Sequence, residues 1–220
     1  LIISNLLNEF YTLEREVKHL DEENVLLAGL IGLLHDIGKT CVPIDIINKP
    51  GKLTEEEYAE VKKHPMYGYN MLRDNYDVSS VARNAILSHH ENEDGSGYPR
   101  ALTGDKIHLF AKIIHVADVY DALTTKRVYK DAMNPADALE YLMGNAERMF
   151  DKELVATFLE YVAPYPLGVQ VELSNGQKAL VVKNNRNMLS RPVVRLNSGA
   201  RVDLMEHLDI TIVKMLTDFN

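Results

Sequence analysis

The sequence predicts a mainly α-helical domain followed by a small β-rich extension. Helix-forming residues and a helical spacing of apolar side chains dominate up to about residue 163. Beyond it, residues alternate between apolar and polar around Asn175-Gly176, as they do in a β-hairpin. Because the linker APYPLG (163–168) separates the two patterns, we expect a helical domain over residues 1–163 and a β-barrel-like domain over residues 164–220.

Composition and charge narrow the class of function. The chain has 220 residues, 46% of them hydrophobic and 25% charged, which suffices for a substantial core. Its formal net charge of −8 argues against a docking face for duplex nucleic acid, whereas a small anionic ligand fits wherever cations or metal ions reverse the local field. Cys41 is the only cysteine, which excludes a disulfide or a thiolate zinc site within the chain.

The sequence also carries some information on location. No apolar run approaches the roughly 20 residues of a membrane span, and the single cysteine fits a reducing compartment. We therefore expect a cytoplasmic protein without membrane contact through these residues. The sequence begins at Leu1 within a helical pattern and without Met, so we expect an upstream region that could hold a sensory domain or a membrane anchor. We also expect a dimer, formed through helices or through that region.

The first predicted helical region covers residues 1–38 and ends at a charged pair. A break near Asp21 could cap a second, strongly apolar segment from Val25 to Leu34. His35 and Asp36 follow this segment directly. Burying such a pair is costly unless a charge compensates it, and a metal ion is the usual compensation. From the pair alone, a metal site and a helix that surfaces at its polar end fit the sequence equally well.

The next predicted helix follows a Pro50-Gly51 turn. Thr54 and Glu57 have the spacing of a capping box, which marks its first turn. His64 precedes Pro65, where the helix should end or restart. A lone histidine at such a position is more often a surface or capping residue than a metal ligand.

A serine-capped helix is predicted over residues 79–90, and two histidines end it. His89 falls on the apolar face, whereas His90 is rotated by about 100° around the helix axis, so the pair could reach two neighbouring metal ions. Gly95 and Gly97 then free the backbone to approach a ligand closely. A solvated turn would explain the glycines but not two histidines.

The most apolar predicted helix covers residues 106–125. Asp118 and Asp121 continue its inward face, where an aspartate needs a partner, and His115 could join Asp118. Arg127 and Lys130 follow, and they could either bind phosphate or be ordinary surface charges. Two further helices, capped by Asn134 and Asp151, have a purely structural pattern, and short strands follow.

The candidate ligands share one property, which is that they offer only nitrogen and oxygen atoms. They are His35, Asp36, His64, His89, His90 and Asp118. Such a set favours Fe, Mn, Zn or Co over copper(I) or an iron–sulfur cluster. A carboxylate has two oxygens, so Asp36 could bridge two ions, and two ions about 4 Å apart activate water and clamp a phosphoryl group.

Taken together, these motifs resemble the HD-GYP family, the branch of the HD-domain metal-dependent phosphohydrolases that hydrolyses cyclic di-GMP. The matching stretches are HDIGK (35–39), KPGKLT (49–54), HP (64–65), HHE (89–91), DGSGYP (94–99), VAD (116–118) and YDALT (120–124). An HD pair alone is a weak signal, but HD, HHE and DGSGYP in this order and spacing are very specific. The similarity covers roughly residues 20–162.

The resemblance implies an HD-domain helical bundle that holds two or three divalent ions, iron or manganese first and zinc or another metal as alternatives. The six candidate ligands would bind these ions, with Asp36 bridging them. Asp36 and Lys39 would be the catalytic residues, because Lys39 would meet the scissile phosphate. The residues that would contact the ligand are Lys39, Gly97, Tyr98, Pro99, Asp121, Arg127 and Lys130. The acids Glu91, Glu93 and Asp94 are instead expected to shape the loop.

One position departs from the family pattern. Most members carry a further histidine ligand on the first helix, and a gap-free count places Ile3 there, which cannot bind metal. His19 lies at a different distance from the HD pair. If the SNLL run at Ser4–Leu7 matches the segment that follows this histidine, the ligand lies upstream of Leu1.

We therefore expect a metal-dependent phosphodiesterase that converts cyclic di-GMP to linear pGpG, and to GMP after a second cleavage, and so lowers the level of a bacterial second messenger. GGDEF-type signalling proteins are expected partners. Two alternatives remain open. One is an HD-type phosphohydrolase for another cyclic dinucleotide or for nucleotides, although the GSGYP loop argues against nucleotides. The other is a catalytically impaired cyclic-dinucleotide receptor or regulatory protein.

Overall fold

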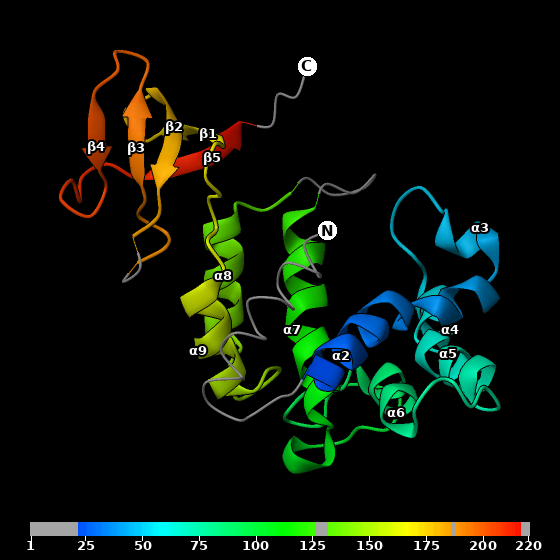
Figure 1. Cartoon of the computed structure of the whole chain (residues 1–220). Coiled ribbons are helices and arrows are strands. Elements are labelled where there is room, and N and C mark those ends of the chain that lie inside the picture. The colour runs from blue at the N-terminus through cyan, green and yellow to red at the C-terminus, as the bar shows by residue number, and fades with distance from the viewer. Residues whose placement is uncertain (1–21, 126–131, 186–187, 217–220) are drawn as a thin grey trace.

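Helices form the first part of the chain and an antiparallel sheet forms the last (Figure 1). The computed structural model describes residues 22–125, 132–185 and 188–216. Its helical elements are α2 (Glu22–Leu34), η1 (Ile37–Cys41), α3 (Ile44–Ile47), α4 (Glu55–Val61), α5 (His64–Leu72), α6 (Ser80–Ser88), η2 (Gly104–Lys106), α7 (Leu109–Thr124), α8 (Pro135–Gly144) and α9 (Lys152–Tyr161). The predicted break near Asp21 lies outside the described residues.

The predicted helix caps are confirmed. The Thr54 hydroxyl accepts a hydrogen bond from the Glu57 amide, while the Glu57 carboxylate accepts one from the Thr54 amide, which completes the capping box of α4. The side chains of Ser79, Asn134 and Asp151 cap α6, α8 and α9 by accepting hydrogen bonds from amides in the first turn, without the reciprocal bond of a capping box. These caps set where each helix begins, and with it the direction in which its side chains point.

Helix α7 is the centre of the helical core. It contacts α2, α6, α8 and α9, and Figure 1 shows it between them. Phe110, Ala111, Ile114 and Ala117 are buried along the face that the spacing predicts. The same face continues to Asp118 near the end of the helix, where α2 and α6 also end.

The C-terminal strands make one open sheet, so the expected β-rich extension is confirmed and the term barrel-like describes it only loosely. The strands are β1 (Gln170–Leu173), β2 (Lys178–Lys183), β3 (Val193–Leu196), β4 (Arg201–Asp203) and β5 (Ile212–Leu216), in the order β4-β3-β2-β1-β5. All neighbouring pairs are antiparallel, and β1 and β2 form the hairpin predicted at Asn175-Gly176. Among the described residues β4 and β5 are both edge strands, because five short strands cover one small core without needing closure.

The sheet and the helices meet at α8. The sheet has its own buried cluster, which includes Tyr165, Val181 and Leu204, and Ala136 of α8 packs against it. Asn134 joins the two parts, because its amide donates to the Val213 carbonyl and its side-chain oxygen accepts from the Tyr165 hydroxyl. In the part of the chain that the structure describes, no helix is long and apolar enough to cross a bilayer.

Candidate metal centre

The HD pair lies at the junction of α2 and η1. His35 follows the last residue of α2, and Asp36 precedes the first residue of η1. Gly38 of η1 packs directly on α5, where a Cβ atom at this position would overlap the His64 carbonyl and the Gly68 amide. This backbone-to-backbone contact brings the Asp36 carboxylate up to the first residue of α5, His64.

Three histidine rings are oriented by the same hydrogen bond. The Nδ1 atoms of His35, His64 and His89 donate to the carbonyl three residues earlier, at distances of 2.8, 2.8 and 2.6 Å. Those carbonyls belong to the last turns of α2, α4 and α6, where a helix leaves carbonyls without partners. A carbonyl only accepts, so each Nδ1 carries a proton, and Nε2 is the free ring nitrogen wherever the imidazole is neutral.

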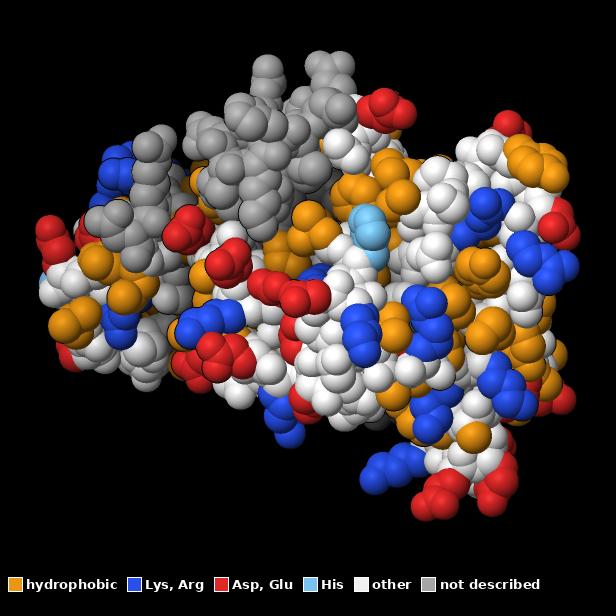
Figure 2. All heavy atoms as spheres, turned by 90° about the horizontal axis from the view of Figure 1, so that it is seen from below, with side chains coloured by type: hydrophobic (Ala, Val, Ile, Leu, Met, Phe, Trp, Pro, Cys, Tyr) orange, Lys and Arg blue, Asp and Glu red, His pale blue; other side chains and the backbone are white. Residues whose placement is uncertain are grey.

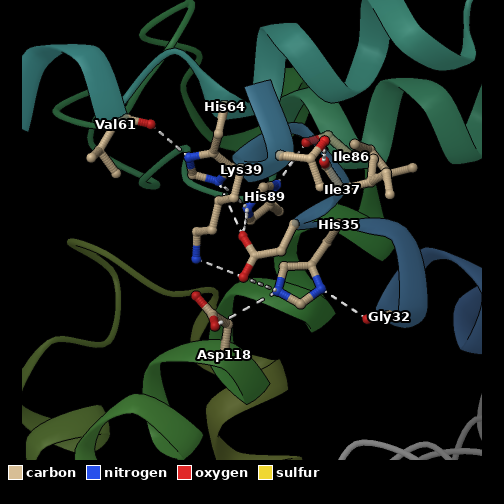
Figure 3. A network of polar contacts seen from close by, with 11 residues as sticks. Gly32, His35, Ile37, Lys39, Val61, His64, Ile86, His89 and Asp118 are labelled. Carbon is tan, nitrogen blue, oxygen red and sulfur yellow. Dashed lines mark hydrogen bonds and ion pairs between the residues drawn. The ribbon is translucent and has the colours of Figure 1, made fainter. Parts of the chain in front are cut away.

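The Nε2 atoms of His64 and His89 approach the Asp36 carboxylate, and Figure 3 shows the side chains of His35, His64, His89 and Asp118 gathered around one point. The Nε2 atom of His64 lies 3.2 Å from that of His89 and 3.3 Å from Asp36 Oδ1. His89 Nε2 lies 3.9 Å from the same oxygen. With His90, these residues form a cluster in which one ligand atom of each lies within 4.8 Å of all the others. The side chain of His64 is buried, which excludes the alternative that it is a surface residue.

The donor chemistry of this cluster fits a cation. Two imidazole lone pairs and a carboxylate oxygen at such distances repel one another unless a positive charge lies among them. Asp36 Oδ1 and His35 Nε2 are buried and have no hydrogen-bond partner among the described residues, although buried polar atoms almost always have one. A ligand set of imidazole and carboxylate suits Fe, Mn, Zn or Co.

Burial keeps two of the histidines in the form that binds metal. It lowers the pKa of His89 to about 3, helped by the nearby His35. It also lowers the pKa of His90, with His89 as the next contributor. Both rings are therefore neutral near pH 7, and a metal ligand must be a neutral imidazole. His90 also stacks on Tyr98, with 4.8 Å between the ring centroids. The loop that carries Gly97, Tyr98 and Pro99, called the GYP loop below, therefore contacts the cluster directly.

Asp118 and Lys39 flank the cluster on the side of His35. The Asp118 carboxylate lies 3.8 Å from His35 Nε2, and Lys39 Nζ lies 2.6 Å from Asp36 Oδ2. Burial disfavours a charged His35, but the nearby carboxylates of Asp118 and Asp36 outweigh it and raise the pKa of His35 to about 10, so this ring is charged near pH 7 and a metal ion would replace its proton. Burial likewise opposes ionisation of Asp36, yet the neighbouring His35 and His64 rings hold its pKa far below the usual range. The two carboxylates thus create a site that attracts positive charge.

The loop that carries the GYP motif is held by a buried acid. Glu91 is 2% exposed, and its two carboxylate oxygens accept hydrogen bonds from the Arg100 and Leu102 amides at 2.7 and 2.9 Å. Gly97 lies against the backbone of residues 90–92 so closely that a Cβ atom would overlap it. The expectation that Glu91 shapes the loop is therefore confirmed, and Gly97 serves close packing within the loop.

Two further contacts of the loop have no signal in the sequence. The Asn92 side-chain oxygen lies 3.0 Å from His115 Nε2. Burial lowers the pKa of His115 to about 4, which keeps it neutral. Lys112 lies 2.9 Å from Glu93 and 3.1 Å from Asp151, so it ties the start of the loop to the cap of α9. Each contact joins residues from separate segments of the chain, and no local sequence pattern predicts it.

Not every predicted site residue joins the cluster. Asp121 lies one turn beyond Asp118 on α7, and its described partners are the amide and hydroxyl of Thr125. Arg127 and Lys130 lie outside the described residues, as do Ile3, His19 and the Ser4–Leu7 run. The structure therefore brings together His35, Asp36, Lys39, His64, His89, His90, Tyr98 and Asp118.

Replacing Gly38 by alanine should separate η1 from α5. The added Cβ would overlap two backbone atoms that cannot rotate away, so we expect a loss of about 3 kcal/mol in the free energy of unfolding and weaker metal binding. Gly29→Ala in α2 is the matched control. Nothing lies within 4 Å of its added Cβ, and alanine favours a helix interior by about 0.5–1 kcal/mol. Urea denaturation of both variants tests this, and equal stabilities would contradict the expectation.

Comparisons with known proteins agree with this geometry. The model of the HD domain family matches residues 6–154. The chain is 42% identical over 174 residues to cyclic di-GMP phosphodiesterase PA4108 of Pseudomonas aeruginosa. The aligned residues make up 79% of this chain and 42% of that protein. It is 43% identical over 129 residues to 3′3′-cGAMP-specific phosphodiesterase 2 of Vibrio cholerae, covering 58% of this chain and 25% of that protein. The chain spans less than half the length of these curated relatives.

A solved structure shows the same fold. Bd1817, an HD-GYP-type protein of Bdellovibrio bacteriovorus, superimposes with a TM-score of 0.56 at 22% identity, covering 71% of this chain and 50% of that one. The resemblance carried by the HD, HHE and DGSGYP motifs is thus confirmed by sequence and by fold. The family model covers most of the chain, including every member of the histidine–aspartate cluster. The chain belongs to the HD domain family.

Proposed function

We propose that this chain hydrolyses a phosphodiester bond of cyclic di-GMP with the help of divalent metal ions, giving linear pGpG and, after a second cleavage, GMP. The observation that carries the proposal is the convergence of the Nε2 atoms of His64 and His89 on Asp36, whose Oδ1 atom is buried with no hydrogen-bond partner among the described residues. Relatives about 40% identical are named cyclic di-GMP phosphodiesterases. Hydrolysis would lower the level of the messenger.

The metal ligands in this proposal are His35, Asp36, His64, His89, His90 and Asp118. Asp36 is the one that bridges, because both its oxygens face other members of the set. We propose two ions, with room in the family pattern for a third. The all-nitrogen and oxygen set accepts Fe, Mn, Zn or Co alike, and iron or manganese is placed ahead of zinc on the family resemblance. When bound, such ions supply a nucleophile at neutral pH and neutralise charge on the phosphoryl group.

The chain's own residues would position the substrate. Lys39 lies beside Asp36 and would place its ammonium group against the scissile phosphate, where negative charge grows in the transition state. Tyr98 is held by its stacking on His90, and Gly97 and Pro99 fix the loop around it. Burial raises the pKa of Tyr98, so the phenol keeps its proton and can donate to the ligand. Asp121, Arg127 and Lys130 complete the proposed substrate contacts.

A second cyclic dinucleotide is a specific alternative substrate. Two relatives 43% identical to this chain are named 3′3′-cGAMP-specific phosphodiesterases. Cyclic di-GMP and 3′3′-cGAMP share the same phosphodiester ring and differ in one purine, so the metal centre would treat them alike. The choice between them would depend on contacts to the base.

The remaining proposals concern the setting of this activity. We propose a cytoplasmic location, GGDEF-type signalling proteins as partners, and a dimer formed through helices or through an upstream region. We also propose a domain boundary at residues 163–164, since Tyr165 is the first buried residue of the sheet cluster and α9 ends at Tyr161.

The test is anaerobic incubation of the chain with each cyclic dinucleotide and Mn²⁺ or Fe²⁺, followed by chromatography of the linear products. We expect turnover of cyclic di-GMP that a chelator abolishes and either metal restores. Preferential turnover of 3′3′-cGAMP would identify this nucleotide, and not cyclic di-GMP, as the substrate. Tight binding of either nucleotide without turnover would favour a receptor and contradict the enzymatic proposal.

Lys39→Gln tests the role of the ammonium group. We expect kcat to fall about 100-fold, as when one preorganised charge is removed from a transition state, while the metal content stays close to that of the wild type. Lys39→Arg should recover part of the rate, because it keeps the positive charge. Steady-state kinetics and metal analysis measure both, and unchanged kcat in Lys39→Gln would exclude the proposed role.

A further inference from the structure

A polar pocket lies along α6, and none of its lining residues belongs to the cluster around Asp36. It has a volume of about 260 Å³. Helix α6 contributes Ser80, Asn84 and Ser88, which recur at intervals of four residues along one side of the helix. The apolar side of α6, with Ala82, Ala85 and Ile86, is buried in the core instead. The pocket is therefore separate from the cluster around Asp36.

Basic side chains from three other segments close this pocket, two of them cations and one a neutral imidazole. They are Arg100, directly after the GYP motif, Lys106 of η2, and His108, the cap of α7. No acid lines it, and among the described residues neither Arg100 nor Lys106 forms an ion pair. In a chain of net charge −8, a pocket of this charge is selective for an anion. Figure 2 shows basic side chains gathered at the centre and right of the face seen from below, with acidic ones mainly toward its edges and left.

The hydrogen bonds of the lining leave donors free. His108 Nδ1 accepts from the Phe110 amide, so the proton of the neutral ring is on Nε2, which becomes a donor. The Arg100 guanidinium uses Nη2 to donate to the Ser88 hydroxyl at 2.6 Å, which holds the fork in place and leaves its other N–H groups available. Ser88 is itself 2% exposed and donates to the Asn84 carbonyl. The floor of the pocket is thus ordered, and the donors above it point to one acceptor-rich ligand.

We propose that this pocket binds a phosphomonoester. A terminal phosphate is a tetrahedral dianion that accepts from several donors at once, which matches an arginine fork beside a lysine and an imidazole N–H. The volume is below the range of about 300–1,000 Å³ that is usual for whole drug-sized ligands, so the pocket takes a phosphate group with part of its ester rather than a cyclic dinucleotide. Inorganic phosphate and a nucleoside monophosphate share the recognised group.

The pocket is connected to the GYP loop through Arg100. Its amide is held by Glu91 inside the loop, while its guanidinium reaches Ser88, the residue before His89. A phosphate bound to this side chain would therefore fix the end of the loop relative to α6. The proposal concerns binding alone and does not depend on the activity of the metal centre.

The test is a titration of the full chain, with a chelator present, by inorganic phosphate, GMP and guanosine at constant ionic strength. The imidazole NMR signals of His108 should shift saturably with phosphate and with GMP but not with guanosine, while those of His207 stay unchanged. Lys106→Gln should weaken phosphate binding about tenfold, as expected for one lost charge-assisted contact. Lys178→Gln, which removes the same charge from β2, should have no effect.

Comparing the affinities for GMP and for inorganic phosphate shows which phosphate compound the pocket binds. Tighter binding of GMP than of inorganic phosphate would assign the pocket to nucleotides, and equal affinities would assign it to the phosphate group alone. Both support the proposal. Equal shifts with chloride, binding by guanosine, or full affinity in a folded Lys106→Gln variant would overturn it. No turnover is measured, so inactivity of the metal centre leaves this result unaffected.

Discussion

Asp36→Ala is expected to abolish turnover and to remove most of the bound metal. Among the described residues, the Asp36 carboxylate is the acid that forms contacts with His35, His64 and His89 together, so its loss leaves imidazoles from three helix ends without this shared anion. We expect kcat to fall by at least about a thousandfold, since charge stabilisation and nucleophile supply fail together. Metal analysis and product chromatography on the same preparation measure the two effects.

Asp77→Ala is the matched control for this variant. Asp77 is exposed, and its replacement by alanine removes the same charge without altering the cluster. It should keep wild-type activity and metal content. A wild type and an Asp36→Ala variant that degrade cyclic di-GMP equally slowly would show that the cluster is not the reacting centre of this chain.

Glu91→Ala is expected to have the second largest effect, through the loop rather than the metal. It would leave the Arg100 and Leu102 amides half-buried without acceptors, which should cost about 3 kcal/mol in the free energy of unfolding. The loop carries Tyr98, whose ring stacks on His90. A displacement of about 1 Å in a positioning residue lowers kcat about 100-fold, and we expect a loss of that size.

Glu91→Gln separates packing from hydrogen bonding in this prediction. Glutamine has the same shape and keeps one acceptor oxygen, so it should retain part of both the stability and the rate. Urea denaturation with steady-state kinetics tests the series. If alanine and glutamine variants both unfold at the wild-type urea concentration, Glu91 does not hold the loop.

Local patterns predicted most of the helical fold. The capping box at Thr54 and Glu57, the caps at Asn134 and Asp151, and the hairpin at Asn175-Gly176 each depend on residues close in sequence, and each is found in the structure. The term barrel-like fits the sheet only loosely, because closure depends on whether β4 meets β5. That is a matter of long-range pairing, on which the alternation of single strands carries no information.

The site was predictable only in part from individual residues. His64 illustrates the limit: before a proline it resembles a cap, and only the order of the family motifs indicated a metal ligand. Its burial comes from the contact of Gly38 with α5, which no local pattern reveals. The ion pairs of Lys112 with Glu93 and Asp151 could not be predicted either, since they join three segments whose charged residues all resemble ordinary surface residues.

The histidine ligands also make the ends of three helices part of the site. Each Nδ1–carbonyl bond that orients a ring exists only while the last turn of α2, α4 or α6 is intact. Fraying of any one of these turns therefore releases a ligand, and a cation that holds the three Nε2 atoms together opposes fraying in all three helices. Cation binding and helix-end opening are thus linked equilibria. Amide hydrogen exchange in these turns should slow together when Mn²⁺ is added, although the turns are far apart in the sequence.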